Sequence, residues 1–232
     1  MNSKQRQYAA LVAKRKECHL CDGLENPALP HLCEFDSDHI GPWSQFHGDL
    51  DAQLMVVGQD WGDVAYFNKY RGLDDLGNPT MRNLETILAC TGLKVRVTSY
   101  ADGDRSLFLT NAILCLKRGG LQATIDPQWV TNCESHFLRQ QIELVRPRVV
   151  VGLGAFAFKA VLRVFGKPLI ELRHAIEDTN GCEILDGVRL FAAYHCGAKT
   201  VNMNRNLDQQ CKDWERIRQF IIQPSPQGRT QR

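Results

Sequence analysis

The chain has 232 residues and a formal net charge of +2, with 44% apolar and 23% charged residues. This length suits one α/β domain with a single core, and this composition excludes a disordered chain. No run approaches the roughly 18 apolar residues of a membrane span, and residues 1–7 lack the apolar region of a signal peptide. We therefore expect a cytoplasmic protein without a membrane partner. The small net charge does not identify any other partner.

Short apolar segments alternate with segments of helical spacing along the chain. Buried strands are expected over residues 54–57, 106–112, 148–154 and 190–194. Helices are expected over residues 3–16, 81–91, 126–145, 155–165 and 204–222. Because strands and helices alternate, we predict an α/β fold: a single three-layer domain over residues 1–222, with helices on both faces of a central parallel four-stranded sheet.

Three segments lack a sustained period. Residues 22–52 are rich in Pro, Gly, His and Asp, which predicts an irregular segment wrapped on the domain. Residues 64–79 are mixed and aromatic, and we expect a loop beside the site described next. Residues 223–232 form a polar tail that we expect to be disordered.

Polar residues stand at the carboxyl ends of three predicted strands. Gln59 and Asp60 follow the first strand within a glycine-bracketed turn, Asn111 closes the second, and His195 follows the fourth. Ligands of open α/β sheets bind at this end. An Asp-containing turn and a structural histidine are each ordinary taken alone, but three polar groups at one rim indicate a site in which an acid faces a hydrogen-bond donor.

Nine cysteines are many for a chain in a reducing compartment, where disulfides are rare. Cys18 and Cys21 form a C-x2-C pair, Cys115 follows the second strand, and Cys133 lies inside the predicted helix 126–145. Four thiolates suit either tetrahedral zinc or a [4Fe-4S] cluster, and their spacing does not decide between them.

Two other interpretations of the cysteines stay open. Cys115 and Cys133 can be small buried residues, and a local zinc site can form from Cys18, Cys21, His31 and Cys33. The cysteines without a spacing argument are interpreted as packing residues: Cys33, Cys90, Cys182, Cys196 and Cys211.

Two further segments are candidates for binding phosphate. Gly152-Leu-Gly154 precedes a predicted helix but lacks the third glycine of a dinucleotide site and a Walker lysine. The glycines favour close helix packing, and Gly154 can alternatively offer backbone N–H groups to a DNA phosphate. Lys199, Asn204 and Arg205 can grip phosphate similarly, and the alternative is a solvated polar loop.

Three segments together with His195 resemble the uracil-DNA glycosylase superfamily, especially its iron-sulfur branch. The segments are Val57-Gly-Gln-Asp-Trp-Gly62, Leu109-Thr-Asn-Ala-Ile-Leu-Cys115, and the run from Cys133 to Gly154 that contains Arg146-Pro-x-Val-Val-Val. The resemblance covers most of residues 18–205 and implies the fold of that superfamily.

The resemblance implies a monofunctional DNA glycosylase acting in base excision. Such an enzyme everts a uracil or modified pyrimidine, hydrolyses its N-glycosidic bond and leaves an abasic site. Asp60, with Gln59 beside it, matches the acid that positions water and supports the sugar cation. His195 matches the histidine that donates to the base oxygen, and Asn111 matches the asparagine that reads the pyrimidine edge.

The resemblance also implies a structural [4Fe-4S] cluster. Its ligands would be Cys18, Cys21, Cys115 and Cys133, and it would anchor residues 17–52 beside DNA. DNA is then the expected partner of a monomeric protein.

The chain departs from the family's motifs around the base. Trp61 replaces the proline after the acid, and Cys196 replaces the proline after the histidine. The phenylalanine that stacks on uracil would fall near Thr80, where no aromatic residue is found. Trp61, Tyr66 and Phe67 are therefore the candidates for stacking.

Gly62 stands where the best-known branch has the tyrosine that blocks C5-substituted pyrimidines. A pocket without that wall can admit a C5-modified or glucosylated cytosine of phage DNA, which would indicate phage defence. The main alternative is a catalytically inactive nucleic-acid or damaged-DNA binding module, although such a module has no need of Asp60. A zinc protein with an unrelated hydrolytic activity is a more distant alternative.

Overall fold

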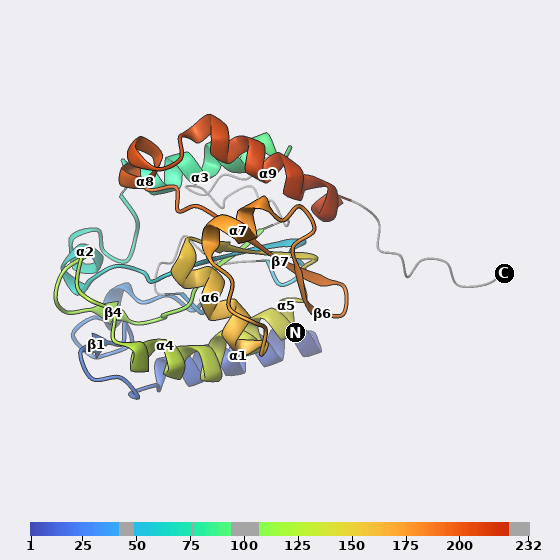
Figure 1. Cartoon of the computed structure of the whole chain (residues 1–232). Helices are drawn as coiled ribbons and strands as arrows, with labels where there is room; N and C mark the ends of the chain where they lie inside the picture. The colour runs from blue at the N-terminus through green and yellow to red at the C-terminus, as the bar shows by residue number, and fades with distance from the viewer. Residues whose placement is uncertain (42–48, 76, 94–106, 223–232) are drawn as a thin grey trace.

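The computed structural model describes residues 1–41, 49–75, 77–93 and 107–222. Its central feature is a five-stranded sheet in the order β3-β2-β5-β7-β6, which lies between two layers of helices (Figure 1). The strands are β2 (Leu54–Gly58), β3 (Leu107–Asn111), β5 (Val149–Leu153), β6 (Cys182–Leu185) and β7 (Val188–Ala193). A separate two-stranded antiparallel sheet joins β1 (Leu24–Glu25) to β4 (Leu116–Lys117).

The predicted three-layer α/β fold is confirmed, with one addition to its sheet. The four predicted strands are present and pair in parallel, and β6 adds an antiparallel edge strand. Strands β6 and β7 form a hairpin in which Leu185 pairs with Val188, and Gly187 in the turn has φ of 74°. An Asp-Gly pair between two apolar segments is a hairpin signal that the strand prediction missed.

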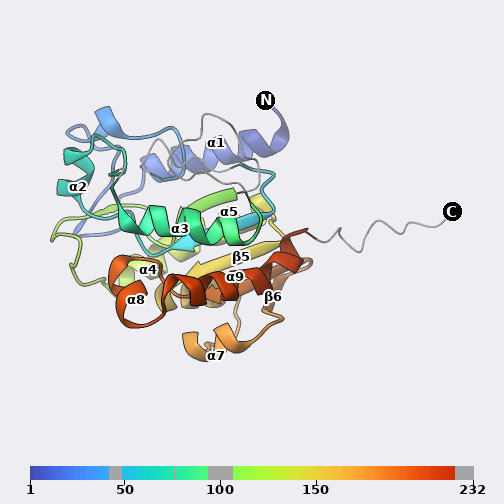
Figure 2. The same ribbon diagram turned by 90° about the horizontal axis from the view of Figure 1, so that it is seen from above.

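The helices cover both faces of the sheet. They are α1 (Ser3–Lys16), α2 (Val64–Lys69), α3 (Pro79–Cys90), α4 (Pro127–Cys133), α5 (Arg139–Val145), α6 (Ala155–Val164), α7 (Leu172–Glu177), α8 (Ala198–Met203) and α9 (Leu207–Ile222). Helices α3 and α9 lie side by side over one face, whereas α1, α5 and α6 cover the other (Figures 1 and 2).

Side-chain alternation along the strands explains the two layers. In β2, Met55 and Val57 pack with the helices of one face, while Leu54 and Val56 pack with α3 and α9 on the opposite face. All four are fully buried, because a parallel sheet covered on both sides must be apolar on both sides.

Three predicted segments differ in detail. The loop expected over residues 64–79 contains α2, whose first turn is capped by the Asp63 carboxylate accepting from the Tyr66 N–H. The helix expected over 204–222 begins three residues later as α9, and the separate short helix α8 precedes it. The helix expected over 126–145 carries a π-helical turn at Glu134–Leu138 between α4 and α5.

Buried polar contacts hold the described part of the irregular segment, which includes a 3-10 turn at Cys33–Phe35. The Arg15 guanidinium pairs with both oxygens of Asp36 at 2.9 Å and donates to the carbonyls of Ser37 and His39. The Asn26 amide donates to three carbonyls at the end of α1 and just after it. These contacts replace the regular hydrogen bonds that the segment lacks.

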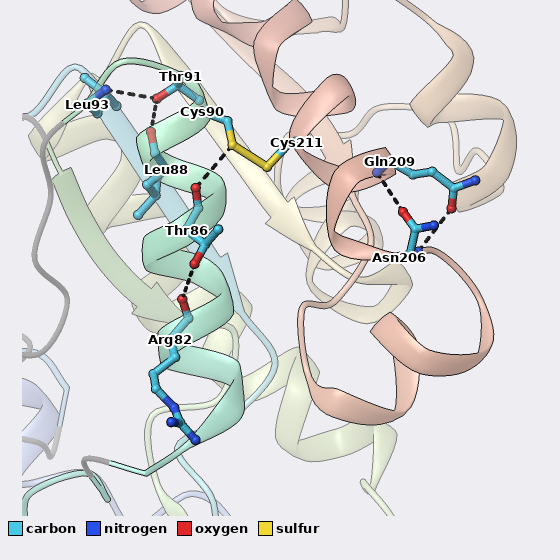
Figure 3. The surroundings of a disulfide bond; sticks show 9 residues. All are labelled: Arg82, Thr86, Leu88, Cys90, Thr91, Leu93, Asn206, Gln209 and Cys211. Carbon is cyan, nitrogen blue, oxygen red and sulfur yellow. Dashed lines mark hydrogen bonds between the residues drawn. A yellow bond between two sulfur atoms is a disulfide. The ribbon is translucent and has the colours of Figure 1, made fainter.

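A disulfide corrects the prediction that Cys90 and Cys211 are packing residues. Their Cα atoms lie 5.6 Å apart, and the bond joins the last turn of α3 to α9 (Figure 3). The two positions are separated by 121 residues in sequence, so only the packing of α3 against α9 brings them together.

None of the described helices is long and apolar enough to span a bilayer. The predicted disorder of residues 223–232 concerns a segment outside the described residues.

Candidate active site

A pocket of about 840 Å³ opens at the carboxyl ends of the parallel strands. Asp60, Asn111 and His195 all line it, although they come from β2, β3 and β7. The sheet therefore brings the three predicted polar residues to one site.

The Asp60 carboxylate is held within the turn that follows β2. Its Oδ1 accepts from the Gly62 N–H at 2.9 Å, and its Oδ2 accepts from Gln59 Nε2 at 2.8 Å. The side chain is only 8% exposed. Hydrogen bonds to both oxygens fix the orientation of this carboxyl group.

Lys117 is a site residue that the sequence analysis missed. Its Nζ lies 3.2 Å from Asp60 Oδ2 and 2.7 Å from the Leu121 carbonyl oxygen, and its side chain is 3% exposed. A lysine after a cysteine in an apolar segment carries no catalytic spacing signal. Only the pairing of β4 beside the Asp60 turn reveals the contact.

Asn111 reaches the pocket across Gly58. The two residues are paired at the ends of β3 and β2, and a Cβ atom on Gly58 would lie 2.1 Å from Asn111 Oδ1. The Asn111 amide is therefore accommodated because Gly58 has no side chain. Within the described part of the chain, no residue hydrogen-bonds to this amide, so it can pair with a ligand.

The His195 ring is oriented by its own loop. Its Nδ1 accepts from the Gly197 N–H at 3.0 Å, which leaves the proton on Nε2. The ring is accessible from the pocket, but burial by the surrounding protein lowers the pKa of His195, and the Asp60 charge opposes this only in part. His195 can therefore donate from Nε2 without carrying a charge.

Helix α3 holds the loop that carries His195. Asn83 Nδ2 donates to the Cys196 carbonyl at 2.7 Å, and Cys196 Sγ donates to the Thr80 carbonyl at 3.3 Å. The buried Cys196 at the family's proline position thus connects the histidine loop to the first turn of α3.

Most of the residues predicted to bind the base line the pocket. They are Asn111, Trp61, Gly62, Tyr66 and Thr80, and Gln59, predicted beside the catalytic acid, lines it as well. Phe67 does not line it: its side chain is 0% exposed and packs edge-to-face on Phe35 in the core, so it is not placed to stack on a base. Phe156, at the start of α6, is a lining aromatic residue that the sequence analysis did not select.

A polar network forms the pocket wall between α2 and α3. The Tyr66 hydroxyl donates to Asp74 Oδ1 at 2.5 Å, and Asn78 Nδ2 lies 3.0 Å from both Asp74 oxygens. Burial raises the pKa of Asp74, and burial together with the bond to Asp74 raises the pKa of Tyr66. Tyr66, Asp75 and Asn78 present this network to the pocket.

The residues predicted to bind phosphate lie in two different environments. Gly154 lines the pocket at the N-terminus of α6, where backbone N–H groups favour an anion, and Lys199 and Asn204 are exposed. Arg205 is engaged elsewhere: its guanidinium pairs with Asp213 at 2.5 and 2.7 Å.

The four predicted ligand cysteines line one smaller cavity of about 230 Å³. Burial raises the pKa of Cys133 to about 12 and that of Cys115 well above its usual range. Helix α4 also fixes the Cys18–Cys21 segment, because Asn132 Nδ2 donates to the Leu20 carbonyl and to Cys21 Sγ. Segments far apart in sequence thus converge on one set of thiols.

Two residues of the alternative local zinc site, His31 and Cys33, have other hydrogen-bond partners in this structure. The His31 ring is paired with Glu25 Oε2 at 2.7 Å, and the exposed Cys33 thiol donates to the Pro30 carbonyl. Across the residues described, no three or more His, Cys, Asp and Glu side chains are grouped to hold a metal ion.

Comparison with known proteins agrees with this geometry. The model of the uracil DNA glycosylase superfamily matches residues 46–221. A type-5 uracil-DNA glycosylase of Pyrobaculum aerophilum is 33% identical over 170 residues, which make up 72% of this chain and 69% of that protein. The chain therefore belongs to the uracil-DNA glycosylase superfamily.

Proposed function

We propose that this protein is a monofunctional DNA glycosylase that hydrolyses the N-glycosidic bond of an everted pyrimidine and leaves an abasic site. One observation carries the proposal: Asp60, Asn111 and His195, from three strands, line a single pocket. A catalytically inactive DNA-binding module of the same fold would not need a carboxylate in such a pocket, since it would repel the phosphates of DNA.

Each of the three residues has a role that fits its contacts. The amide of Asn111 pairs with the edge of the base, because the described residues leave it without another partner. The neutral His195 donates its Nε2 proton towards the base oxygen, on which negative charge grows as the bond to the sugar lengthens.

Asp60 acts on the sugar side of the breaking bond. Its carboxylate offsets the positive charge of the oxocarbenium-like sugar and orients the attacking water, while Gln59 holds it in place. Replacing Asp60 is expected to lower the rate of base release by about 10²- to 10⁴-fold.

Binding of the DNA backbone is assigned to the rim of the pocket. Gly154 offers the N-terminus of the ten-residue helix α6 to a phosphate, and the exposed Lys199 and Asn204 add contacts. Arg205 is a weaker candidate for binding phosphate, because its guanidinium is already paired with Asp213.

A C5-modified pyrimidine is a second candidate substrate. Gly62 lines the pocket without a side chain, and a volume of about 840 Å³ lies in the range of sites for drug-sized ligands, well beyond what a bare pyrimidine fills. The Asn111 amide can present a donor or an acceptor, so it can also pair with cytosine derivatives. Hydroxymethylated or glucosylated cytosine would point to defence against phage.

Substrate profiling tests both candidates. Purified protein is incubated with duplex and single-stranded oligonucleotides that carry uracil, a thymine mismatch, hydroxymethylcytosine or glucosylated hydroxymethylcytosine, and free base is measured. Asp60→Asn, which keeps the shape of the side chain, serves as the control. Release by wild type but not by the variant supports the glycosylase, and release of uracil alone contradicts the modified-base candidate. Tight DNA binding with no release from any substrate would instead support the inactive module.

We also propose that Cys18, Cys21, Cys115 and Cys133 hold a structural [4Fe-4S] cluster. The residues fit such a group, because four thiols from distant segments line one cavity. The cluster would tie the irregular N-terminal segment to α4 and to the loop after β3. Its role would be structural, as the cavity is separate from the pocket that holds Asp60.

Metal analysis of anaerobically purified protein tests this assignment. Iron and acid-labile sulfide in equal amounts, lost in Cys115→Ser and retained in the matched variant Cys33→Ser, would support the cluster. One zinc per chain with no iron would contradict it.

A further inference from the structure

We infer that Lys117 is a positioning residue for Asp60. It determines which carboxylate oxygen of Asp60 faces the substrate, and it fixes the adjoining pocket wall. The inference rests on the proposed glycosylase function and assigns a residue beyond the acid, the asparagine and the histidine.

The Lys117–Asp60 contact is a buried ion pair inside the pocket. The ammonium and the carboxylate lie 3.2 Å apart, and both side chains are almost inaccessible to solvent. A buried charge is stable only when it is paired and hydrogen-bonded, so removing either partner leaves the other poorly accommodated. The positions of the two side chains are therefore coupled.

The two oxygens of the Asp60 carboxylate accept different numbers of hydrogen bonds. A carboxylate has about four lone-pair sites, two on each oxygen. Gln59 and Lys117 both donate to Oδ2, whereas Oδ1 accepts only the Gly62 N–H among the described residues. The remaining site on Oδ1 is available to a water molecule or to the sugar. Without Lys117, Oδ2 keeps a single donor and the carboxylate can rotate.

The backbone and the ammonium of Lys117 both hold the turn that carries the acid. The Lys117 N–H donates to the Gly62 carbonyl at 3.0 Å, so β4 runs alongside the turn. The ammonium also binds the Leu121 carbonyl, and Leu121 is a pocket-lining residue next to Gly62. Lys117 thus joins the acid to the wall of the pocket.

Single-turnover kinetics of Lys117→Met and Lys117→Arg test the inference. With the substrate found by profiling, Lys117→Met is expected to lower the rate of base release about 10- to 100-fold, the size of one lost charge-assisted hydrogen bond. The dissociation constant for DNA should change less than about threefold, and Lys117→Arg should recover part of the rate.

Lys4→Met is the matched control. Lys4 Nζ contacts one carboxylate oxygen, Asp51 Oδ1 at 3.0 Å, and one carbonyl, Val145 O at 3.2 Å, outside the pocket. Lys4→Met removes a lysine with the same two kinds of contact from a solvent-exposed site without touching Asp60, and its rate should match wild type.

A double-mutant cycle separates positioning from a general effect on folding. In the Asp60→Asn background, Lys117→Met should lower the rate of base release by less than about a further twofold, because the carboxylate that Lys117 positions is already absent. An additive loss would overturn the inference, and so would an unchanged rate in Lys117→Met. Trapping of a covalent Lys117–DNA adduct by borohydride would also overturn it, since the lysine would then be a nucleophile. If Lys117→Met does not fold, the same cycle is run with Lys117→Arg. A rate that Lys117→Arg lowers in the wild-type background but not in the Asp60→Asn background supports the role.

A crystallographic readout keeps the inference separate from the proposed function. If wild type releases no base from any substrate, the proposed function fails, but crystals of Lys117→Met still show where the Asp60 carboxylate points. Loss of the Gly62 N–H contact to Oδ1 supports positioning by Lys117, and an unmoved carboxylate refutes it.

Discussion

Replacing Gly58 with alanine tests whether base release depends on the position of the Asn111 amide. A Cβ atom at Gly58 would lie 2.1 Å from Asn111 Oδ1 and 3.3 Å from its Cγ. Carbon–oxygen contacts in proteins settle at about 3.3 Å, so the amide oxygen must move by about 1 Å. Gly58 has no positive φ, and alanine is therefore compatible with its backbone.

The displaced atom is at the end of a side chain, so catalysis should suffer more than stability. A displacement of about 1 Å from productive geometry can cost about 10²-fold in rate, which corresponds to about 2.7 kcal/mol of transition-state stabilisation. The strand itself stays paired, and the change in the free energy of unfolding is expected to remain below about 1 kcal/mol.

The assay compares Gly58→Ala, Asn111→Ala and the double variant in single-turnover base release, with urea unfolding measured in parallel. The losses of Gly58→Ala and Asn111→Ala should be similar. The double variant should be no slower than Asn111→Ala alone, because the amide that meets the new methyl group is gone. Wild-type rates in Gly58→Ala, with Asn111→Ala impaired, would refute the reasoning.

Three further predictions concern pH, the disulfide and the core. Burial lowers the pKa of His195 below its ordinary value of 6.5, so protonation in the unfolded state begins first as pH falls. Stability should therefore begin to decline below about pH 6.5, whereas base release should decline only at the lower pH at which His195 of the folded protein is protonated. Both pH profiles should flatten in His195→Gln. Reduction of Cys90–Cys211, which spans 121 residues, should lower the free energy of unfolding by up to about 5 kcal/mol, and identical urea curves with and without dithiothreitol would contradict the bridge. In Gly152→Ala the new Cβ would lie 2.4 Å from Phe158 Cα, so α6 must shift and stability should fall by about 1–3 kcal/mol; an unchanged urea midpoint would count against this packing.

The three-layer fold was predictable from the local pattern of apolar residues. Residues 54–57 and 149–151 are continuous apolar runs, and such runs between helical segments form parallel strands buried on both faces. Because the carboxyl ends of parallel strands share one edge, the sequence also predicted that Asp60, Asn111 and His195 would meet, and they line one pocket.

Other features depended on contacts between distant segments. Phe67 has the same aromatic character as Tyr66, yet the helix that begins after Asp63 turns Phe67 into the core and Tyr66 towards the pocket. The disulfide likewise required α3 to lie against α9, which no spacing between Cys90 and Cys211 encodes.

The sequence by itself determined which polar groups end the central strands, because strand periodicity and sheet polarity are local properties. Only the tertiary structure decided what surrounds those groups. Lys117 contacts Asp60 because β4 runs beside the turn after β2. The Asn111 amide lies over Gly58 because β2 and β3 are paired in register. Both contacts join residues more than 50 positions apart, and their energies depend on packing that local pattern does not specify.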